Sequence, residues 1–154
     1  MLRRCVRFLT TAPGVLWRWR RQRWPSKLQV LGDTDWAGCP ITRRSTSGAV
    51  ALFGQHLIWA SSTTPIPVSL SSGEAEVYGL TKVCSRAIGL RHLAMVLGYM
   101  RHGPLPLEVG TDSAAAKGIA SRRGWIQAAL QTRKIEALVK MPGNRNPFVS
   151  PNRG

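Results

Sequence analysis

Residues 28–33 read Leu-Gln-Val-Leu-Gly-Asp, a short and mostly apolar stretch that stops at a carboxylate. Its alternation predicts a β-strand over Leu28–Gly32 that ends at Asp33. Two further β-rich runs follow and are separated by a two-residue turn, which is typical of a hairpin. These runs are Gly48–Phe53 and His56–Ser61, with Gly54-Gln55 between them. The first half of the chain therefore predicts a strand followed by a hairpin.

A long helix is expected next. Ser71 or Ser72 can cap its first turn, where Glu74 suits the helix dipole, and apolar residues continue to Leu97 before glycine and proline end it. Shorter segments follow: a strand at Leu105–Thr111, a helix at Ser113–Ala120, a weaker helix at Trp125–Gln131 and a last strand at Ile135–Met141. This order predicts an α/β domain built on a mixed sheet.

The composition argues against several classes of protein and favours one class of binding partner. The chain has 154 residues, enough for one domain, and no apolar run is long enough to cross a membrane. Three widely spaced cysteines without a CxxC pair argue against a disulfide scaffold or a zinc module and favour a reducing compartment. Lysine and arginine number 22 against 7 acids, a formal net charge of +15. Such a chain attracts polyanions, above all nucleic acid.

Residues 1–32 contain no acid, and their arginines alternate with Trp17, Trp19 and Trp24. Three interpretations remain open from composition alone. The segment could be a mitochondrial transit peptide, a nucleic-acid-binding arm in which tryptophans stack on bases, or a linker helix over Met1–Thr10 that ends at a Pro-Gly break.

Because acids are rare, their positions are informative. Asp33 and Asp112 each end a predicted strand, and Glu76 lies in the first turns of the long helix. If the two strands are neighbours, the three carboxylates converge and need a cation between them, and oxygen ligands favour Mg²⁺ or Mn²⁺. The alternative is that the aspartates cap turns and Glu76 is an ordinary acid at a helix start.

Four motifs occur in unbroken order over roughly Leu28–Gly124. They are Gly32-Asp33-Thr-Asp35-Trp-Ala-Gly38, Thr42-Arg-Arg-Ser-Thr-Ser-Gly48, Ser69-Leu-Ser-Ser-Gly-Glu-Ala-Glu76 and Thr111-Asp112-Ser113. Together they closely resemble the ribonuclease H domain of copia-type LTR-retrotransposon (retrovirus-related) Pol polyproteins. Residues 2–9 also resemble that family's connection helix between reverse transcriptase and ribonuclease H, which favours the linker over the transit peptide.

The resemblance implies a ribonuclease H-like fold, a mixed five-stranded sheet flanked by helices, and two-metal hydrolysis of the RNA strand of an RNA–DNA hybrid. Asp33, Glu76 and Asp112 would be the catalytic residues and the ligands of two Mg²⁺ (or Mn²⁺) ions, while Asp35 and Glu74 would be neighbours without that role. The candidate nucleic-acid contacts are Arg43, Arg44, Arg122 and Arg123. The resemblance also implies an ancestral tether to reverse transcriptase and a cytoplasmic or nuclear location.

The sequence departs from the family after the third acid. Gly124 runs directly into Trp125, without the family's His-x-Asp or His-x-Glu segment. The family's fourth acid follows an Asn-Pro pair, but Asn146-Pro147 is followed by Phe148, and no acid occurs after Glu136. We therefore expect a truncated domain whose C-terminal part is incomplete and whose fourth acidic ligand is missing.

We expect three regions: a basic connection segment at 1–27, the ribonuclease H-like domain at 28–141 and a disordered tail at 142–154. Three functional hypotheses stand. The first is a Mg²⁺-dependent ribonuclease H, which the three placed acids support. The second is a non-catalytic, basic nucleic-acid-binding remnant, which the net charge and the missing fourth acid support. The third is a pseudogene product without a biochemical role.

Overall fold

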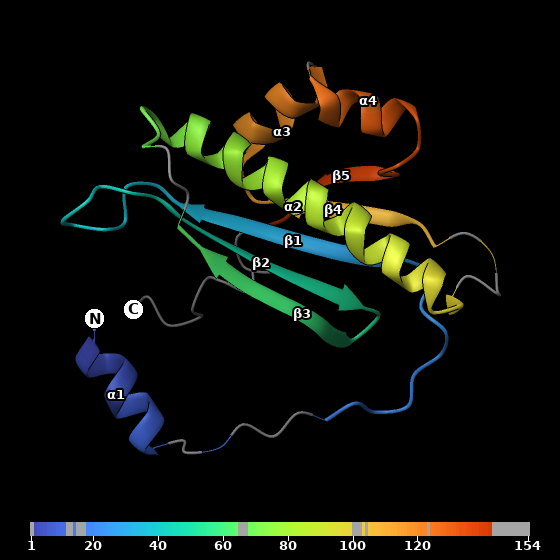
Figure 1. Cartoon of the computed structure of the whole chain (residues 1–154), viewed down its shortest axis with the longest axis horizontal. Coiled ribbons are helices and arrows are strands. Elements are labelled where there is room, and N and C mark those ends of the chain that lie inside the picture. Colours follow the sequence, from blue (N-terminus) through green and yellow to red (C-terminus); the bar gives the residue numbers. More distant parts are fainter. Residues whose placement is uncertain are drawn as a thin grey trace.

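The computed structural model describes residues 2–11, 14, 18–64, 68–99, 103, 105–122 and 124–142. Five strands form one sheet in the order β3-β2-β1-β4-β5, and helices flank it (Figure 1). The strands are β1 (Leu28–Asp35), β2 (Thr46–Phe53), β3 (His56–Thr63), β4 (Leu107–Thr111) and β5 (Ala137–Lys140). The helices are α1 (Leu2–Thr11), α2 (Ser72–Val96), α3 (Ala114–Arg122) and α4 (Trp125–Gln131).

The sheet is mixed, as predicted. Strands β1, β2 and β3 are antiparallel neighbours, whereas β1 pairs with β4, and β4 with β5, in parallel. The parallel register between β1 and β4 ends at the pair Gly32–Thr111. The residue after each member of this pair is an aspartate, Asp33 within β1 and Asp112 directly after β4, so both are placed at the same edge of the sheet.

The core lies between one face of the sheet and the helices α2, α3 and α4. Its buried members include Leu28 and Val30 from β1, Leu107 and Val109 from β4, and Val83 from α2. Two glycines allow α2 to approach the strands closely. A Cβ on Gly32 would collide with Val83, and a Cβ on Gly79 would collide with Thr34. This close contact fixes the height of α2 above β1.

Helix α2 begins and ends near the predicted limits. Ser71 is its N-cap, with extended backbone angles, and its hydroxyl accepts a hydrogen bond from the Glu74 amide at 3.1 Å. At the other end, the Leu97 and Gly98 amides donate to carbonyls of the last turn. Gly98 takes a φ of 76°, a left-handed conformation that glycine adopts without steric cost.

Several predicted strand limits are wrong: β2 begins at Thr46 and not at Gly48, β3 ends at Thr63 and not at Ser61, and β4 begins at Leu107 and not at Leu105. Two further differences concern acidic residues. Strand β1 does not end at Asp33 but continues to Asp35, because its antiparallel pairing with β2 runs on past the end of β4, with Asp33 opposite Gly48. Strand β5 is shorter than predicted, so Glu136 lies before it and not within it. The Glu136 carboxylate instead accepts a hydrogen bond from the Leu107 amide and pairs with Arg91 at 3.3 Å.

The segment before β1 packs on the hairpin. The Gln22 side chain donates to the Phe53 carbonyl at 2.9 Å and accepts from the Gln55 amide at 2.9 Å. The Trp24 ring lies edge-on to Phe53 and stacks with Tyr99. Helix α1 lies apart from the sheet (Figure 1). The tail predicted at 142–154 falls outside the described residues beyond position 142.

In the described part of the chain, no helix combines the length and apolar character needed to cross a bilayer.

Candidate functional site

Three carboxylates meet at the edge of the sheet. Asp33, Glu76 and Asp112 each offer an oxygen, and these oxygens all lie within 4.8 Å of one another. All three side chains are partly buried. The structure thus brings together the three acids that the sequence singled out, from strand β1, helix α2 and the residue that follows β4.

The backbone around the two aspartates is held by local hydrogen bonds. The Thr34 amide donates to Asp33 Oδ1 at 2.9 Å. On the other strand, Ser113 follows Asp112 and caps α3, because its hydroxyl accepts from the Ala116 amide at 3.1 Å. The chain therefore turns sharply from β4 into α3 at Asp112, which holds this residue at the end of the sheet.

The helix cap decides which of the two glutamates reaches the cluster. The Glu74 carboxylate accepts a hydrogen bond from the Leu70 amide at 2.7 Å, so it stabilises the helix start together with Ser71. Glu76, two residues later, projects in a different direction around the helix and joins the aspartates. Glu74 is a capping residue, and Glu76 is the residue of the cluster.

Electrostatics at the cluster are unfavourable in the absence of a cation. Burial, followed by the negative charges of Asp112 and Asp33, raises the pKa of Glu76 from 4.5 to about 7. Like charges at this distance disfavour each other's ionised forms. A bound cation would remove that penalty and keep all three groups ionised.

The donor set fits a hard divalent cation. Carboxylate oxygens are the ligands that Mg²⁺, Mn²⁺ and Ca²⁺ prefer, and no sulfur or imidazole ligand joins the cluster among the described residues. Asp33, Glu76 and Asp112 are therefore the residues that would hold such ions.

The other acids of the chain have separate positions. Asp35 is exposed, and its carboxylate lies against Gly38 in the turn after β1. Glu108 pairs with Lys27 at 2.8 Å and accepts from Gln29, and Glu136 bonds to the Leu107 amide and Arg91. All seven acids lie in the described part of the chain, and no fourth carboxylate joins the cluster there.

The predicted arginine contacts lie on the surface and are spread out. Arg43 and Arg44 are exposed in the turn between β1 and β2, where the Arg43 amide donates to the Cys39 carbonyl. Arg122 is exposed at the last turn of α3, a position that also suits the helix dipole. Arg123 lies outside the described residues.

The polar region beside the cluster was not predicted from the sequence. Thr34 and Ser47 are buried on neighbouring strands and share a hydrogen bond of 3.2 Å between their hydroxyls. Lys82 of α2 donates to Thr63 Oγ1 of β3 across the same region. The four-residue spacing of Lys82 and Arg86, which puts two cations on one side of a helix, was the available signal.

Comparison with solved structures shows the class of fold. LC11-RNase H1, isolated from compost by a metagenomic approach, superimposes with a TM-score of 0.50 at 17% identity, covering 79% of this chain and 88% of that one. The chain therefore has the ribonuclease H fold.

Two other ribonuclease H structures are similar at lower scores. The N-terminal RNase H domain of rv2228c from Mycobacterium tuberculosis has a TM-score of 0.48 at 16% identity, covering 80% and 88% of the two chains. RNase H1 from Halobacterium salinarum has a TM-score of 0.45 at 14% identity, covering 78% and 89%.

Sequence comparison gives one partial relative. A stretch of 54 residues is 44% identical to an uncharacterized mitochondrial protein of Arabidopsis thaliana, AtMg00810. The match covers 34% of this chain and 22% of that protein, so the chain spans about a fifth of the length of this curated relative. No protein-family model matches the chain.

Proposed function

We propose that the chain is a metal-dependent nuclease domain of the ribonuclease H type, which hydrolyses the RNA strand of an RNA–DNA hybrid. The observation that carries the proposal is the cluster of Asp33, Glu76 and Asp112 at one edge of a sheet with the ribonuclease H fold. The net charge of +15 supports a polyanionic substrate.

Each part of the cluster has a role in the proposed reaction. Bound Mg²⁺ or Mn²⁺ would activate the attacking water and stabilise charge on the leaving oxygen. The protein's own contribution is to fix three carboxylates on rigid elements: Asp33 through β1, Asp112 through the turn into α3, and Glu76 through the capped start of α2. The scissile phosphate would approach this edge of the sheet from solvent, since all three carboxylates remain partly exposed.

The retrotransposon origin is part of the same proposal. It is supported by the four motifs that resemble copia-type Pol polyproteins, and a former tether to reverse transcriptase is supported by the resemblance of residues 2–9 to the connection helix. The absence of a fourth carboxylate from the cluster supports weaker metal binding and slower turnover than a four-acid site would give.

The test is a cleavage assay with an end-labelled RNA–DNA hybrid, in Mg²⁺, in Mn²⁺ and in EDTA. We expect metal-dependent cutting of the RNA strand by the wild-type chain and loss of cutting in Asp33→Asn. Asp35→Asn is the matched control, since it makes the same chemical change two residues away and should still cut. Retained hybrid binding without cutting by the folded wild-type chain would contradict the proposal and would favour a non-catalytic nucleic-acid-binding remnant.

A further inference from the structure

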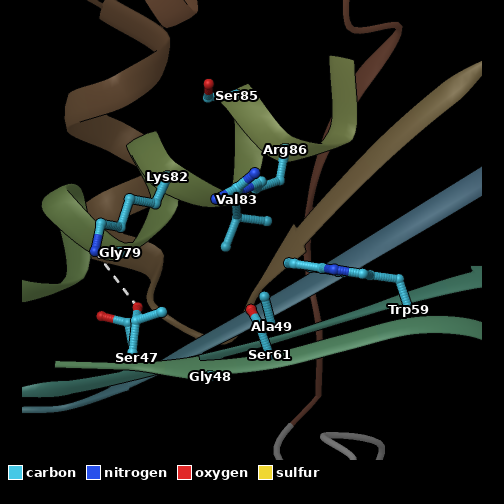
Figure 2. A pocket seen from close by; sticks show the side chains of 11 residues that line it. Ser47, Gly48, Ala49, Trp59, Ser61, Gly79, Lys82, Val83, Ser85 and Arg86 are labelled. Carbon is cyan, nitrogen blue, oxygen red and sulfur yellow. Dashed lines mark hydrogen bonds between the residues drawn. The ribbon is translucent and has the colours of Figure 1, made fainter. Parts of the chain in front are cut away.

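A basic cleft lies beside the acidic cluster, between α2 and the strands β2 and β3 (Figure 2). Its volume is about 290 Å³. Lys82 and Arg86 come from the helix, and Trp59 and Ser61 come from β3 below it (Figure 2). The lining residues include two cations, several hydroxyls and an indole, and no carboxylate.

The two cations of the cleft are available to a ligand. Lys82 and Arg86 are exposed, and within the described residues, which include every acid of the chain, neither forms a salt bridge. The Lys82 ammonium donates a hydrogen bond of 3.4 Å to Thr63 Oγ1, a neutral partner. One helical turn separates the two residues, so both charges face the same cleft. The site is therefore electropositive, and among the described residues the partner that an anion would displace from Lys82 is the Thr63 hydroxyl.

The cleft continues the acidic cluster along the sheet. Gly48, which lines the cleft, is the cross-strand partner of Asp33. Ser47, also in the lining, bonds to Thr34, whose amide in turn donates to Asp33. The cleft and the cluster therefore share neighbouring backbone positions on β1 and β2.

We infer that this cleft is a binding subsite for the phosphodiester backbone of a nucleic-acid strand, adjacent to the cleavage site. Lys82 and Arg86 contact phosphates, the hydroxyls of Ser61 and Thr63 donate hydrogen bonds, and the half-buried indole of Trp59 packs against a sugar or an unstacked base. The inference rests on the proposed function for the identity of the ligand. The residues to which it assigns these contacts, Lys82, Arg86, Ser61, Thr63 and Trp59, lie outside the four sequence motifs.

The test measures binding of a labelled RNA–DNA hybrid in EDTA, so that the strands stay intact, over a series of salt concentrations. Lys82→Gln combined with Arg86→Gln removes both cations from exposed helix positions, where glutamine preserves the fold. We expect affinity to fall about tenfold and the slope of log affinity against log salt to decrease by about 2, one for each lost phosphate contact.

The matched control is Arg133→Gln combined with Lys134→Gln, which removes the same charge from an exposed turn between α4 and β5. The slope of log affinity against log salt for this control variant should lie closer to the wild-type slope than that of the Lys82/Arg86 double variant does. Equal affinity and equal slope in the two double variants would overturn the inference, because the loss would then depend only on net charge.

Two further measurements separate the possible outcomes. A hybrid with neutral methylphosphonate linkages in the DNA strand shows which strand the subsite binds. If it binds DNA, the wild type and the Lys82/Arg86 double variant should bind this hybrid with equal affinity. If it binds RNA, the difference in affinity between them should persist. The cleavage assay separates the subsite from the proposed function.

If the wild type cuts the hybrid, but the Lys82/Arg86 double variant binds it no more weakly than the control variant does, the subsite alone is overturned. Specific binding loss without cutting by the wild type would contradict the proposed nuclease and leave the subsite standing.

Discussion

Replacing Glu76 with glutamine should make the metal-free protein more stable above neutral pH. The pKa of Glu76 is raised from 4.5 to about 7 by burial and by Asp112 and Asp33, so the folded state binds its proton more tightly than the unfolded chain does. The stability that Glu76 contributes is therefore fully present below pH 4.5 and is lost as the pH rises through about 7. Glutamine carries no charge at any of these pH values and avoids that loss.

The size of the effect follows from the pKa shift. A rise from 4.5 to about 7 corresponds to at most about 3.5 kcal/mol, since one pKa unit is worth about 1.4 kcal/mol. The carboxyl is half-buried, and solvent screening lowers the expected difference to about 1–2 kcal/mol. Glu76→Gln should thus exceed the wild type by about 1–2 kcal/mol at about pH 8.5 and should match it near pH 4.

The assay is urea denaturation in EDTA across this pH range, repeated with Mg²⁺. Mg²⁺ should stabilise the wild type by about 1.4 kcal/mol at ten times its dissociation constant and should stabilise Glu76→Gln much less. Glu74→Gln is the control for the metal arm, because Glu74 caps the helix and should leave the Mg²⁺ effect intact. A metal-free Glu76→Gln protein that is less stable than the wild type at high pH would refute the reasoning, because Glu76 would then be held by favourable contacts and not by a strained cluster.

Substitutions at three positions test the framework of the site. Gly79→Ala should destabilise the protein by about 1–3 kcal/mol in urea denaturation and should reduce its metal affinity. The added methyl group collides with Thr34 and pushes α2 away from the sheet. Unchanged stability would show that the helix can shift freely. Ser71→Ala should lower the free energy of unfolding by about 1 kcal/mol through loss of the cap, and Ser71→Asp should restore it. Glu136→Ala should lower the free energy of unfolding by about 1–3 kcal/mol, since it leaves the Leu107 amide without its carboxylate partner. Glu136→Gln should lower it less. Equal losses in the two variants would argue against that hydrogen bond.

The order and type of the elements could be predicted because local patterns specify them. The alternation at residues 28–32, the Gly54-Gln55 turn and the Ser71 cap each belong to a few consecutive residues, and the structure confirms the strand, the hairpin and the helix they indicate. The end of β1 could not be predicted this way. It depends on pairing with β2, whose residues lie more than ten positions further along the chain. Asp33 pairs with Gly48 and Asp35 with Thr46, which extends β1 beyond its apolar run.

The acidic cluster could be predicted only in part. The rarity of acids and their positions at strand ends pointed to Asp33, Glu76 and Asp112, but their meeting depends on β4 lying beside β1, which sequence order does not determine. The basic cleft was not predicted. It joins Lys82 of α2 to Thr63 of β3, which lie 19 residues apart and meet only in the tertiary structure.

Binding of Mn²⁺ tests the central claim, that the three carboxylates form a divalent-cation site, most directly. Electron paramagnetic resonance of free Mn²⁺, titrated against the wild-type chain, Asp33→Asn and Asp35→Asn, measures the affinity without any need for turnover. We predict that the wild type binds Mn²⁺ that Mg²⁺ displaces, that Asp35→Asn binds equally well, and that Asp33→Asn loses at least about tenfold in affinity, since even changes outside the ligand set cost about 10- to 100-fold. Equal Mn²⁺ binding by Asp33→Asn and the wild type, or no displaceable Mn²⁺ on the folded wild-type chain, would contradict the claim.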